Sequence, residues 1–527
     1  MLSELAQSQY RGFIKVLPKR GEIKTSDRFP IVTNKVSYQL FINPTEIKDK
    51  NQTVLTLSSL LDITKASVSA QLLPDRFWVP VKSGITASKK EEIEKMQLPG
   101  VGFEEHYTRF YPEASVAAHL LGFVGKNEAG TDKGYVGLEG FYDRLLRGKD
   151  GYLLELNDAL GRPIIPKRTP MLGGSDGGNL LLSMDRPVQF LVEQKLKDGI
   201  EKYAASGGMI GIMDPQTGDV ISMTSSPSFS PQKYWEYDES LYTNPFITNT
   251  YEPGSTLKPI IMAGALDAGL ITPQTKCNIC GGPISVSGYE LHTWNDKYYK
   301  DTNMIEVIQH SDNTGMVFVA LKLGADRMIS YLTKFGIGEL TGIDLQGETA
   351  PSLKPRSAWY DVDLATTGFG QGISITPMEL LTAFSALANG GKLMQPRVVA
   401  AIENSNGEVF KMPTKVTSQP ISEKTAKVMT EILVNAVEKG EAQWTKLKGY
   451  RIAGKTGTAS IPVKGHYDPN STIVSFIGFA PVEKPKFVML VILDKPTTSI
   501  YAADTAAPIF FDIAADLLNY YGIPPSE

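Results

Sequence analysis

The chain has 527 residues, enough for roughly two or three domains with a core in each. An apolar fraction of 42% is typical of a globular protein, and a formal net charge of −4 argues against a nucleic-acid partner. No apolar stretch reaches the length of about eighteen residues that a membrane-spanning helix needs, and no signal peptide follows Met1. Taken alone, these features predict a cytosolic protein.

The first part of the chain, residues 1–172, is expected to form one unit of mixed helix and strand. Short strands are predicted over 20–23 and 36–42, and a hairpin over 151–165. The predicted helices, in chain order, cover 53–63, 89–95, 114–121 and 141–146. We call this unit the pedestal.

The glycine-rich segment 173–178 is the clearest linker in the sequence. It also matches G-x-S-x-G, the nucleophile pattern of α/β-hydrolases, which requires a strand before it and a helix after it. Here a strand, 179–184, is predicted to follow. The segment is therefore interpreted as the boundary between a domain of residues 1–172 and a second domain of residues 179–527.

The second domain alternates in character along its length. A helix over 188–203 is followed by strands over 208–213 and 220–224, which are joined by a turn with strong hairpin chemistry. Residues 255–440 are mainly helical, with helices over 303–309, 314–323, 325–335, 377–388 and 423–438. Strands then return over 452–459, 473–479 and 487–493, before a final helix over 506–521. This order predicts an α+β fold in which an antiparallel sheet packs against helices.

The two cysteines, Cys277 and Cys280, form a C-x-x-C pattern. A zinc site would need two further ligands, and the nearest histidine, His292, supplies at most one. A thioredoxin-like motif would require a βαβ context, whereas glycines and prolines surround this pair. We expect no metal here, and a loop whose thiols are free, or bridged in an oxidising compartment.

Three short motifs carry the chemistry. Ser255-x-x-Lys258 stands at a predicted helix start, Ser311-Asp312-Asn313 lies between two predicted helices, and Lys455-Thr456-Gly457-Thr458 lies on a predicted strand. Each has an ordinary alternative when taken alone: a solvated helix start, a helix N-cap, or a turn at a strand edge. Their occurrence together, in this order and in these contexts, favours a catalytic interpretation.

Ser255 is the candidate nucleophile. A serine hydroxyl needs a base, and none of the five histidines lies in a recognisable triad context. Lys258 can serve if burial and a neighbouring cation such as Lys455 depress its pKa far below the usual value of about 10.4. Ser311 can relay the proton to the leaving amine.

The remaining motif residues are suited to binding an extended peptide. Lys455 can bind a carboxylate, Asn313 can bond a substrate amide, and the small Gly457 is expected to let a substrate backbone approach. The backbone N–H groups of Ser255 and Thr458 are the candidate donors to a tetrahedral oxyanion.

Together, the three motifs match the set found in penicillin-binding proteins and class A β-lactamases. Further stretches extend the resemblance to class B penicillin-binding proteins over nearly the whole chain. They are Met213-Asp214-Pro215, Phe369-Gly370-Gln371-Gly372, Ala388-Asn389-Gly390-Gly391 and, in the pedestal, Arg20-Gly21-Glu22-Ile23, Arg109-Phe110-Tyr111-Pro112 and Gly137-Leu138-Glu139.

The resemblance implies a transpeptidase domain with the serine β-lactamase type of fold, behind an elongated, non-catalytic, dimerisation-type pedestal. It implies a peptidoglycan D,D-transpeptidase in which Ser255 is acylated, Lys258 is the general base and Ser311 is the proton relay. The residues implied to line the substrate strand are Asn313, Lys455, Thr456, Gly457 and Thr458. No cofactor is implied, and β-lactams are expected to acylate Ser255.

The same resemblance changes the expected compartment. It implies a protein at the extracytoplasmic face of the bacterial membrane, held by a single N-terminal span that this sequence does not contain. The implied partners are peptidoglycan stem peptides and, through the pedestal, a membrane-embedded glycosyltransferase and other division or elongation proteins.

Two alternatives stay open. One is a hydrolase of the same superfamily, either a D,D-carboxypeptidase or a β-lactamase, although the pedestal is large for a small lactamase and no deacylating glutamate is recognised. The other is a protein that serves mainly as a scaffold in a division or elongation complex.

Overall fold

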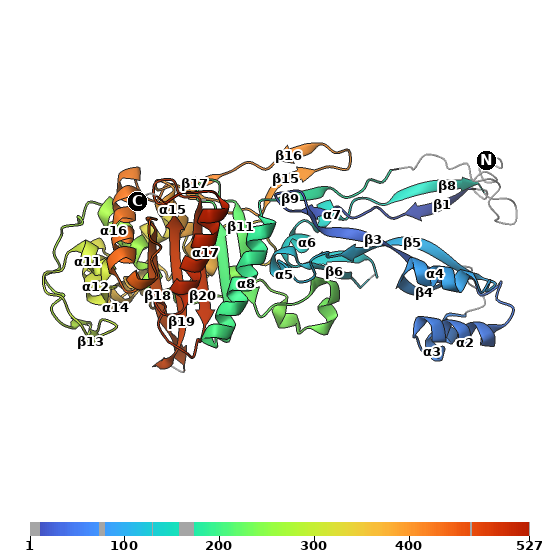
Figure 1. Cartoon of the computed structure of the whole chain (residues 1–527), viewed down its shortest axis with the longest axis horizontal. Helices are drawn as coiled ribbons and strands as arrows, with labels where there is room; N and C mark the ends of the chain where they lie inside the picture. The colour runs from blue at the N-terminus through green and yellow to red at the C-terminus, as the bar shows by residue number, and fades with distance from the viewer. Residues whose placement is uncertain (1–10, 73–78, 129, 157–172, 464–465, 526–527) are drawn as a thin grey trace.

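The computed structural model describes residues 11–72, 79–128, 130–156, 173–463 and 466–525. The molecule is elongated, with a broad helix-rich body at one end and a slender, strand-rich arm at the other (Figure 1). Within the described residues, no helix combines the length and the apolar character needed to cross a membrane.

A five-stranded antiparallel sheet forms the centre of the broad body. Its strand order is β11-β10-β20-β19-β18. The strands are β10 (Gly207–Met213), β11 (Val220–Ser226), β18 (Ala453–Val463), β19 (His466–Ala480) and β20 (Phe487–Asp494). Because β10 pairs with β20, strands from the beginning and from the end of the second domain lie side by side in one sheet. The antiparallel sheet of the predicted α+β fold is confirmed.

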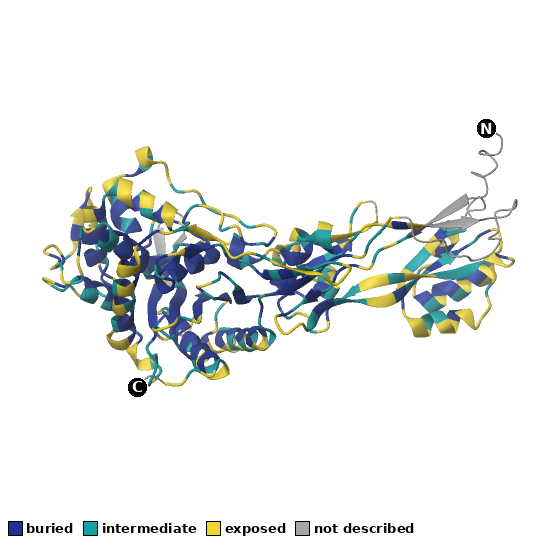
Figure 2. Cartoon of the chain, turned by 90° about the horizontal axis from the view of Figure 1, so that it is seen from above, coloured by how far each residue is buried: buried dark blue, intermediate teal, exposed yellow. Residues whose placement is uncertain are grey.

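Alternate residues of the central strands face two different cores. Phe476 and Val491 pack with α8 (Arg186–Tyr203) and α17 (Ala506–Tyr520) on one side. Ile477 and Leu490 pack into the helical half on the other side. Since both faces are covered, the strand 487–493 is apolar at nearly every position, and its residues are all buried. Figure 2 shows buried residues concentrated in this sheet and its helices.

The helical half contains the helices that the sequence predicts, with ends shifted by a few residues. They are α11 (Met304–Gln309), α12 (Asn313–Leu323), α13 (Ala325–Lys334), α15 (Pro377–Ala388) and α16 (Glu423–Lys439). A further helix, α10 (Lys258–Asp267), lies among them and is buried along most of its length.

A seven-stranded sheet forms much of the arm. Its order is β16-β15-β9-β2-β3-β4, with β5 also paired to β3. The strands are β2 (Ile23–Lys24), β3 (Pro30–Ile42), β4 (Val79–Ile85), β5 (Val101–Phe110), β9 (Asn179–Leu182), β15 (Val399–Glu403) and β16 (Val409–Lys411). Three of these strands, β9, β15 and β16, come from the predicted second domain. The sheet therefore contains strands from both sides of the domain boundary expected at 173–178. The domain ranges 1–172 and 179–527 stay a prediction.

The segment predicted as a linker is packed against the pedestal. The Gly177 N–H donates to the Lys19 carbonyl (2.9 Å), and Lys149 and Ser175 form an isolated bridge. A Cβ at Gly177 would lie 1.7 Å from the Leu146 carbonyl oxygen, so only glycine allows this approach. A strand, β9, follows the segment, which therefore lacks the helix that a nucleophile elbow requires.

The pedestal differs from the sequence prediction in several places. The helix expected over 114–121 is reduced to α5 (Ala118–Leu121), because Ala114 and Ala117 adopt positive φ angles of 55° and 56°. The helix expected over 141–146 is divided into α6 (Gly137–Phe141) and α7 (Asp143–Leu146). Helices α2 (Lys50–Leu61) and α4 (Ala87–Glu94) match their predictions, and α3 (Lys65–Gln71) is additional.

The hairpin expected over 151–165 takes another form in the part that the structure describes. Its first half is β8 (Gly151–Leu156), which pairs with β1 (Arg11–Val16), near the start of the chain. Its second half lies outside the described residues.

A buried ion cluster joins the three pedestal stretches of the family resemblance. Glu139 is fully buried and accepts from Arg20 Nε (2.7 Å) and Arg109 Nε (2.6 Å). Arg20 Nη1 also donates to Asp143 (2.8 Å). The cluster therefore connects α6 and α7 with β5 and with the segment that leads into β2.

Candidate active site

Ser255 lies in η3 (Gly254–Thr256), a 3₁₀ turn directly before α10. Helix α10 begins at Lys258 and places Pro259 in its first turn, where the missing N–H has no helical partner to lose. Gly254 has a φ of 56°, and its N–H donates to the Gly370 carbonyl (3.0 Å). The serine is thus held on a tight turn, and the lysine lies at the buried start of the helix.

Lys258 is completely buried and makes three hydrogen bonds. Its Nζ donates to the Ser311 carbonyl (2.6 Å), to Asn313 Oδ1 (2.8 Å) and to Ser311 Oγ (3.3 Å). Burial, aided by the nearby positive charge of Lys455, lowers the pKa of Lys258 to about 7. The carboxylates of Glu441 and Asp312 act on this pKa in the opposite direction.

Ser311 connects Lys258 to the candidate nucleophile, Ser255. Its Oγ donates to Ser255 Oγ (2.9 Å) and accepts from Lys258 Nζ. Within the described residues, no hydrogen bond joins Lys258 Nζ directly to Ser255 Oγ. The two residues of the S-x-x-K motif are instead linked through Ser311. Ser311 has a φ of 53°, a conformation that non-glycine residues adopt at a small energetic cost and often at functional sites.

The remaining residues of the second motif begin helix α12. Asp312 is the N-cap, and its Oδ1 accepts from the N–H (2.8 Å) and Oγ1 (2.7 Å) of Thr314. Asn313 donates through Nδ2 to the His292 carbonyl (3.1 Å) while its Oδ1 accepts from Lys258. The N-cap interpretation is therefore confirmed for Asp312, while the catalytic interpretation of Ser311 and Asn313 stays a prediction.

The third motif lies on β18, the outermost strand of the five-stranded sheet. Lys455 is 3% exposed, and its Nζ donates to Thr456 Oγ1 (2.9 Å). Thr456 Oγ1 in turn donates to Glu441 Oε2 (2.6 Å), which lies 3.9 Å from Lys455 Nζ. Burial lowers the pKa of Lys455, and Glu441 opposes the shift. Thr458 Oγ1 accepts from the Ala502 N–H (3.2 Å).

The structure gives Gly457 a packing role, and its expected role in substrate binding stays a prediction. A Cβ at this position would lie 2.6 Å from Ser475 Oγ and 2.7 Å from Thr256 Cγ2. The space is therefore already filled by the chain itself. Gly457 allows the turn that carries Ser255 to pack directly against β18.

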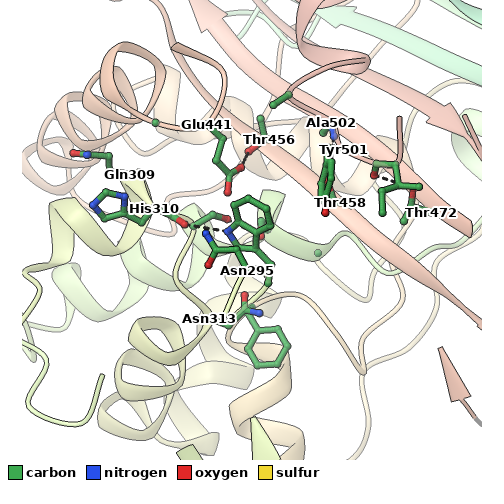
Figure 3. Close-up of a pocket in the computed structure, with 18 of the residues that line it drawn as sticks. Asn295, Gln309, His310, Asn313, Glu441, Thr456, Thr458, Thr472, Tyr501 and Ala502 are labelled. Atoms are coloured by element: carbon green, nitrogen blue, oxygen red, sulfur yellow. Dashed lines mark hydrogen bonds between the residues drawn. The ribbon is translucent and has the colours of Figure 1, made fainter. Parts of the chain in front are cut away.

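A cavity of about 830 Å³ opens over these residues. Of the predicted site residues, Ser255, Ser311, Asn313, Thr456 and Thr458 line it. Lys258 and Lys455 are buried and do not line the cavity. Each donates a hydrogen bond to a residue that does, Lys258 to Ser311 and Lys455 to Thr456. Figure 3 shows Asn313 and Thr458 from separate elements facing the same space.

Several residues that line the cavity lie outside the three sequence motifs and are not predicted as site residues by the sequence. They are Glu441, His292, Trp294, Tyr299, His310 and Tyr501. Trp294 Nε1 donates to the His310 carbonyl (3.3 Å), and its ring meets that of Tyr501 edge-on at 5.7 Å. Tyr299 stacks on His310 at 4.3 Å. These aromatic residues all line the cavity.

The two cysteines are paired with each other in a disulfide, and both are buried. The choice left open between free and bridged thiols is thus settled in favour of the bridge. The Cys277 N–H donates to the Thr302 carbonyl (2.8 Å), so the pair lies at the base of the loop that carries Trp294 and Tyr299. Across the described part of the chain, no group of three or more His, Cys, Asp or Glu residues is arranged to hold a metal ion.

Comparisons with known proteins agree with this arrangement. The family model described as "Penicillin binding protein transpeptidase domain" matches residues 208–515, and "Penicillin-binding Protein dimerisation domain" matches residues 15–182. Stage V sporulation protein D of Bacillus subtilis is 33% identical over 533 residues, covering 100% of this chain and 82% of the relative. Peptidoglycan D,D-transpeptidase FtsI of Escherichia coli is 27% identical, covering 97% of this chain and 85% of FtsI.

Solved structures share the fold over nearly the whole chain. A peptidoglycan synthetase from Bifidobacterium adolescentis superposes with a TM-score of 0.80 at 25% identity, covering 98% of both chains. Penicillin Binding Protein 2X from Streptococcus thermophilus has a TM-score of 0.77 at 24% identity, covering 96% of this chain and 80% of that one. With a transpeptidase match over more than half of its length and a dimerisation domain before it, the chain belongs to the class B penicillin-binding proteins.

Proposed function

We propose that this chain is a peptidoglycan D,D-transpeptidase that cross-links stem peptides through an acyl-enzyme on Ser255. The observation that carries the proposal is the path Ser255–Ser311–Lys258 at the floor of the cavity, which ends in a buried lysine with a pKa lowered to about 7. A lysine of this kind can accept a proton at neutral pH, which an ordinary exposed lysine cannot.

In the acylation step, Ser255 Oγ attacks the carbonyl carbon of the D-Ala-D-Ala bond. Its proton passes to Ser311 Oγ, while Ser311 gives its own proton to neutral Lys258. The C–N bond then breaks, and the leaving amine of D-alanine receives a proton along the same path. The N–H groups of Ser255 and Thr458 are the proposed donors to the oxyanion, a contribution of about 10²–10³ in rate per donor.

Substrate binding is assigned to the residues around the nucleophile. We assign the terminal carboxylate of the donor peptide to Lys455, with Thr456 and Thr458 on the same strand beside it. Asn313 bonds a peptide amide. The outer edge of β18 is suited to an extended peptide, because an edge strand presents backbone donors and acceptors to an added chain.

The second half-reaction transfers the acyl group to an amine. The amine nitrogen of a neighbouring stem peptide attacks the ester carbonyl, and its proton goes to the Ser311–Lys258 pair. The ester C–O bond breaks, and Ser255 Oγ recovers a proton. β-Lactams enter at the first step only and acylate the same serine.

Labelling with a fluorescent penicillin tests the proposal. The wild-type protein is expected to take up one label, located on Ser255 by peptide mass analysis, and Ser255→Ala is expected to take up none while remaining folded by circular dichroism. Folded wild-type protein that resists labelling would contradict the proposal. Formation of cross-linked product from purified lipid-linked peptidoglycan strands would establish the transfer step.

A hydrolytic function is the second candidate, and one observation favours it. Glu441 places a carboxylate in the cavity beside Thr456, where it could act on a water molecule. The lifetime of the penicilloyl-enzyme separates the two functions. An acyl-enzyme that persists for many minutes supports the transpeptidase, whereas turnover within seconds supports a β-lactamase.

We infer that the protein works at the extracytoplasmic face of the membrane, where peptidoglycan is assembled. The Cys277–Cys280 disulfide supports this, because disulfides persist mainly in oxidising compartments. We assign docking of a membrane-embedded glycosyltransferase and other division or elongation proteins to the pedestal. Growth of a depletion strain on Ser255→Ala would show that the scaffold role outweighs the chemistry.

A further inference from the structure

Glu441 is an acidic residue inside the cavity that none of the three motifs contains. It follows α16 after a single residue, Gly440, at which a Cβ would lie 2.2 Å from the Ala436 carbonyl and 2.9 Å from that of Gln309. Glycine therefore lets the chain turn tightly from the helix end toward the cavity. Figure 3 shows the Glu441 side chain extending to Thr456. Its side chain is 22% exposed, so it is largely shielded from bulk water.

The hydrogen bond to Glu441 makes the Thr456 hydroxyl an acceptor, rather than a donor, toward Lys455. The Thr456 hydroxyl has one proton, which it donates to Glu441 Oε2 (2.6 Å). Its oxygen is then an acceptor for Lys455 Nζ (2.9 Å), which also donates to the Thr456 carbonyl (3.2 Å). Two of the three ammonium protons are thereby committed to one residue. In the described chain, no third hydrogen bond of Lys455 Nζ is found, and this leaves a donor for an incoming carboxylate.

The negative charge of Glu441 also offsets the positive charges of two buried lysines. Lys455, on β18, lowers the pKa of Lys258, on α10, and both lysines are removed from water. Two acidic groups oppose this effect: Asp312 at the start of α12, which acts on Lys258, and Glu441, which acts on both lysines. Glu441 is therefore the one acidic residue whose charge bears on both lysines in the described site.

We propose that Glu441 is a positioning residue, which acts through Thr456 to orient Lys455 toward the substrate carboxylate and sets the charge balance between the two active-site lysines. This inference rests on the transpeptidase function proposed above. It assigns a role in the reaction to a side chain that touches Thr456 rather than the substrate.

The test is the pH dependence of acylation by benzylpenicillin. Acylation requires neutral Lys258 and protonated Lys455, so the rate rises with pH through the first pKa and falls through the second. Glu441→Gln keeps the shape and an oxygen acceptor for Thr456 but removes the charge. Because the charge raises both pKa values, its loss is expected to move both limbs of the profile to lower pH, by roughly 0.5–1 unit.

Companion variants separate charge from shape. Glu441→Asp keeps the charge and is expected to keep the limb positions. Glu438→Gln removes a charge from the exposed face of the same helix and is expected to match the wild type. Glu441→Ala and Thr456→Val are each expected to weaken the apparent affinity for penicillin about tenfold, and their effects should not add, since both break the same chain of bonds.

The outcomes are distinct. Limb positions in Glu441→Gln equal to those of the wild type, even with a lower maximal rate, would overturn the inference and leave Glu441 a space-filling residue. Wild-type protein that is never acylated on Ser255 would overturn the transpeptidase proposal itself. A shift of both limbs, with Glu438→Gln unchanged, supports the assignment.

Discussion

The proposed nucleophile, Ser255, depends on two partners, Ser311 and Lys258. Ser255 lies on a 3₁₀ turn, Ser311 lies between α11 and α12, and Lys258 is buried at the start of α10. Ser311 bonds both of the others, so it is the proposed site through which the proton moves. Two predictions concern these individual side chains.

Ser311→Ala is expected to slow acylation of Ser255 by about 10²–10⁴ without greatly weakening penicillin binding, because it interrupts proton transfer. Stopped-flow acylation at several penicillin concentrations separates the rate from the affinity. Ser385→Ala is a matched control, since Ser385 is a fully buried serine whose hydroxyl bonds the Thr382 carbonyl within α15. A Ser311→Ala rate within a factor of about three of the wild type would contradict the relay.

The acylation rate is expected to rise with pH to half its plateau near pH 7. Burial disfavours the charged form of Lys258 and lowers its pKa to about 7, so the amine is mainly protonated below that pH and mainly neutral above it. On the acidic side the rate should fall about tenfold per pH unit. Measurement between about pH 5 and pH 9 in buffers of constant ionic strength checks this. The chosen range includes roughly pH 5–8, where folded proteins tend to be most stable. A flat profile would exclude Lys258 as the base.

At the scale of elements, the site depends on how closely η3 packs against its neighbours. Gly457 allows contact between η3 and β18. At Gly370, which has a φ of 85°, a Cβ would lie 2.0 Å from the Gly254 carbonyl oxygen. The turn that carries Ser255 is therefore enclosed by glycines on both sides, and its position depends on their lack of side chains.

Gly457→Ala is expected to push η3 away from β18, to lower stability by about 1–3 kcal/mol and to reduce acylation at least tenfold. Thermal unfolding and penicillin labelling measure the two effects. Gly282→Ala is the control, because a Cβ there meets no atom within 4 Å and the backbone φ is ordinary. Unchanged acylation in Gly457→Ala would show that the turn tolerates displacement.

At the scale of the whole molecule, the seven-stranded sheet joins the pedestal to the second half of the chain. Strands β15 and β16 extend along the arm, where β16 pairs with β15, β15 pairs with β9, and β9 pairs with β2 (Figure 1). Asp344 adds a partly buried link, since it accepts from the Val398 N–H (2.6 Å), the Val399 N–H (2.9 Å) and the Tyr142 hydroxyl (2.9 Å). The pedestal is therefore connected to the catalytic half by both backbone and side-chain bonds.

Removal of the pedestal carboxylate Glu139 should destabilise the molecule without removing the active site. Glu139→Ala leaves Arg20 and Arg109 buried without their shared partner, and a loss of about 3–5 kcal/mol is expected. Calorimetry measures the loss, and labelling at low temperature should still mark Ser255. Glu92→Ala breaks an exposed pair with Lys89 and should cost no more than about 1 kcal/mol. Equal effects of the two variants would contradict the role of burial.

By itself, the sequence determined the residue types that the chemistry requires and the elements with strong local patterns. Ser255, Lys258, Ser311 and Lys455 could be named because their motifs are short and contiguous. Helices such as α8 and α16 and strands such as β20 could be predicted because their apolar spacing is set by neighbours along the chain.

Only the tertiary structure decided the features that depend on residues far apart in the sequence. It placed β15 and β16 in the arm and paired Cys277 with Cys280. It also linked Lys258 to Ser255 through Ser311 and placed Glu441 close to Lys455. It also showed that Gly457 lets η3 pack against β18. The physical reason is that hydrogen bonding, burial and close packing depend on which atoms meet in space, and local periodicity carries no information about that.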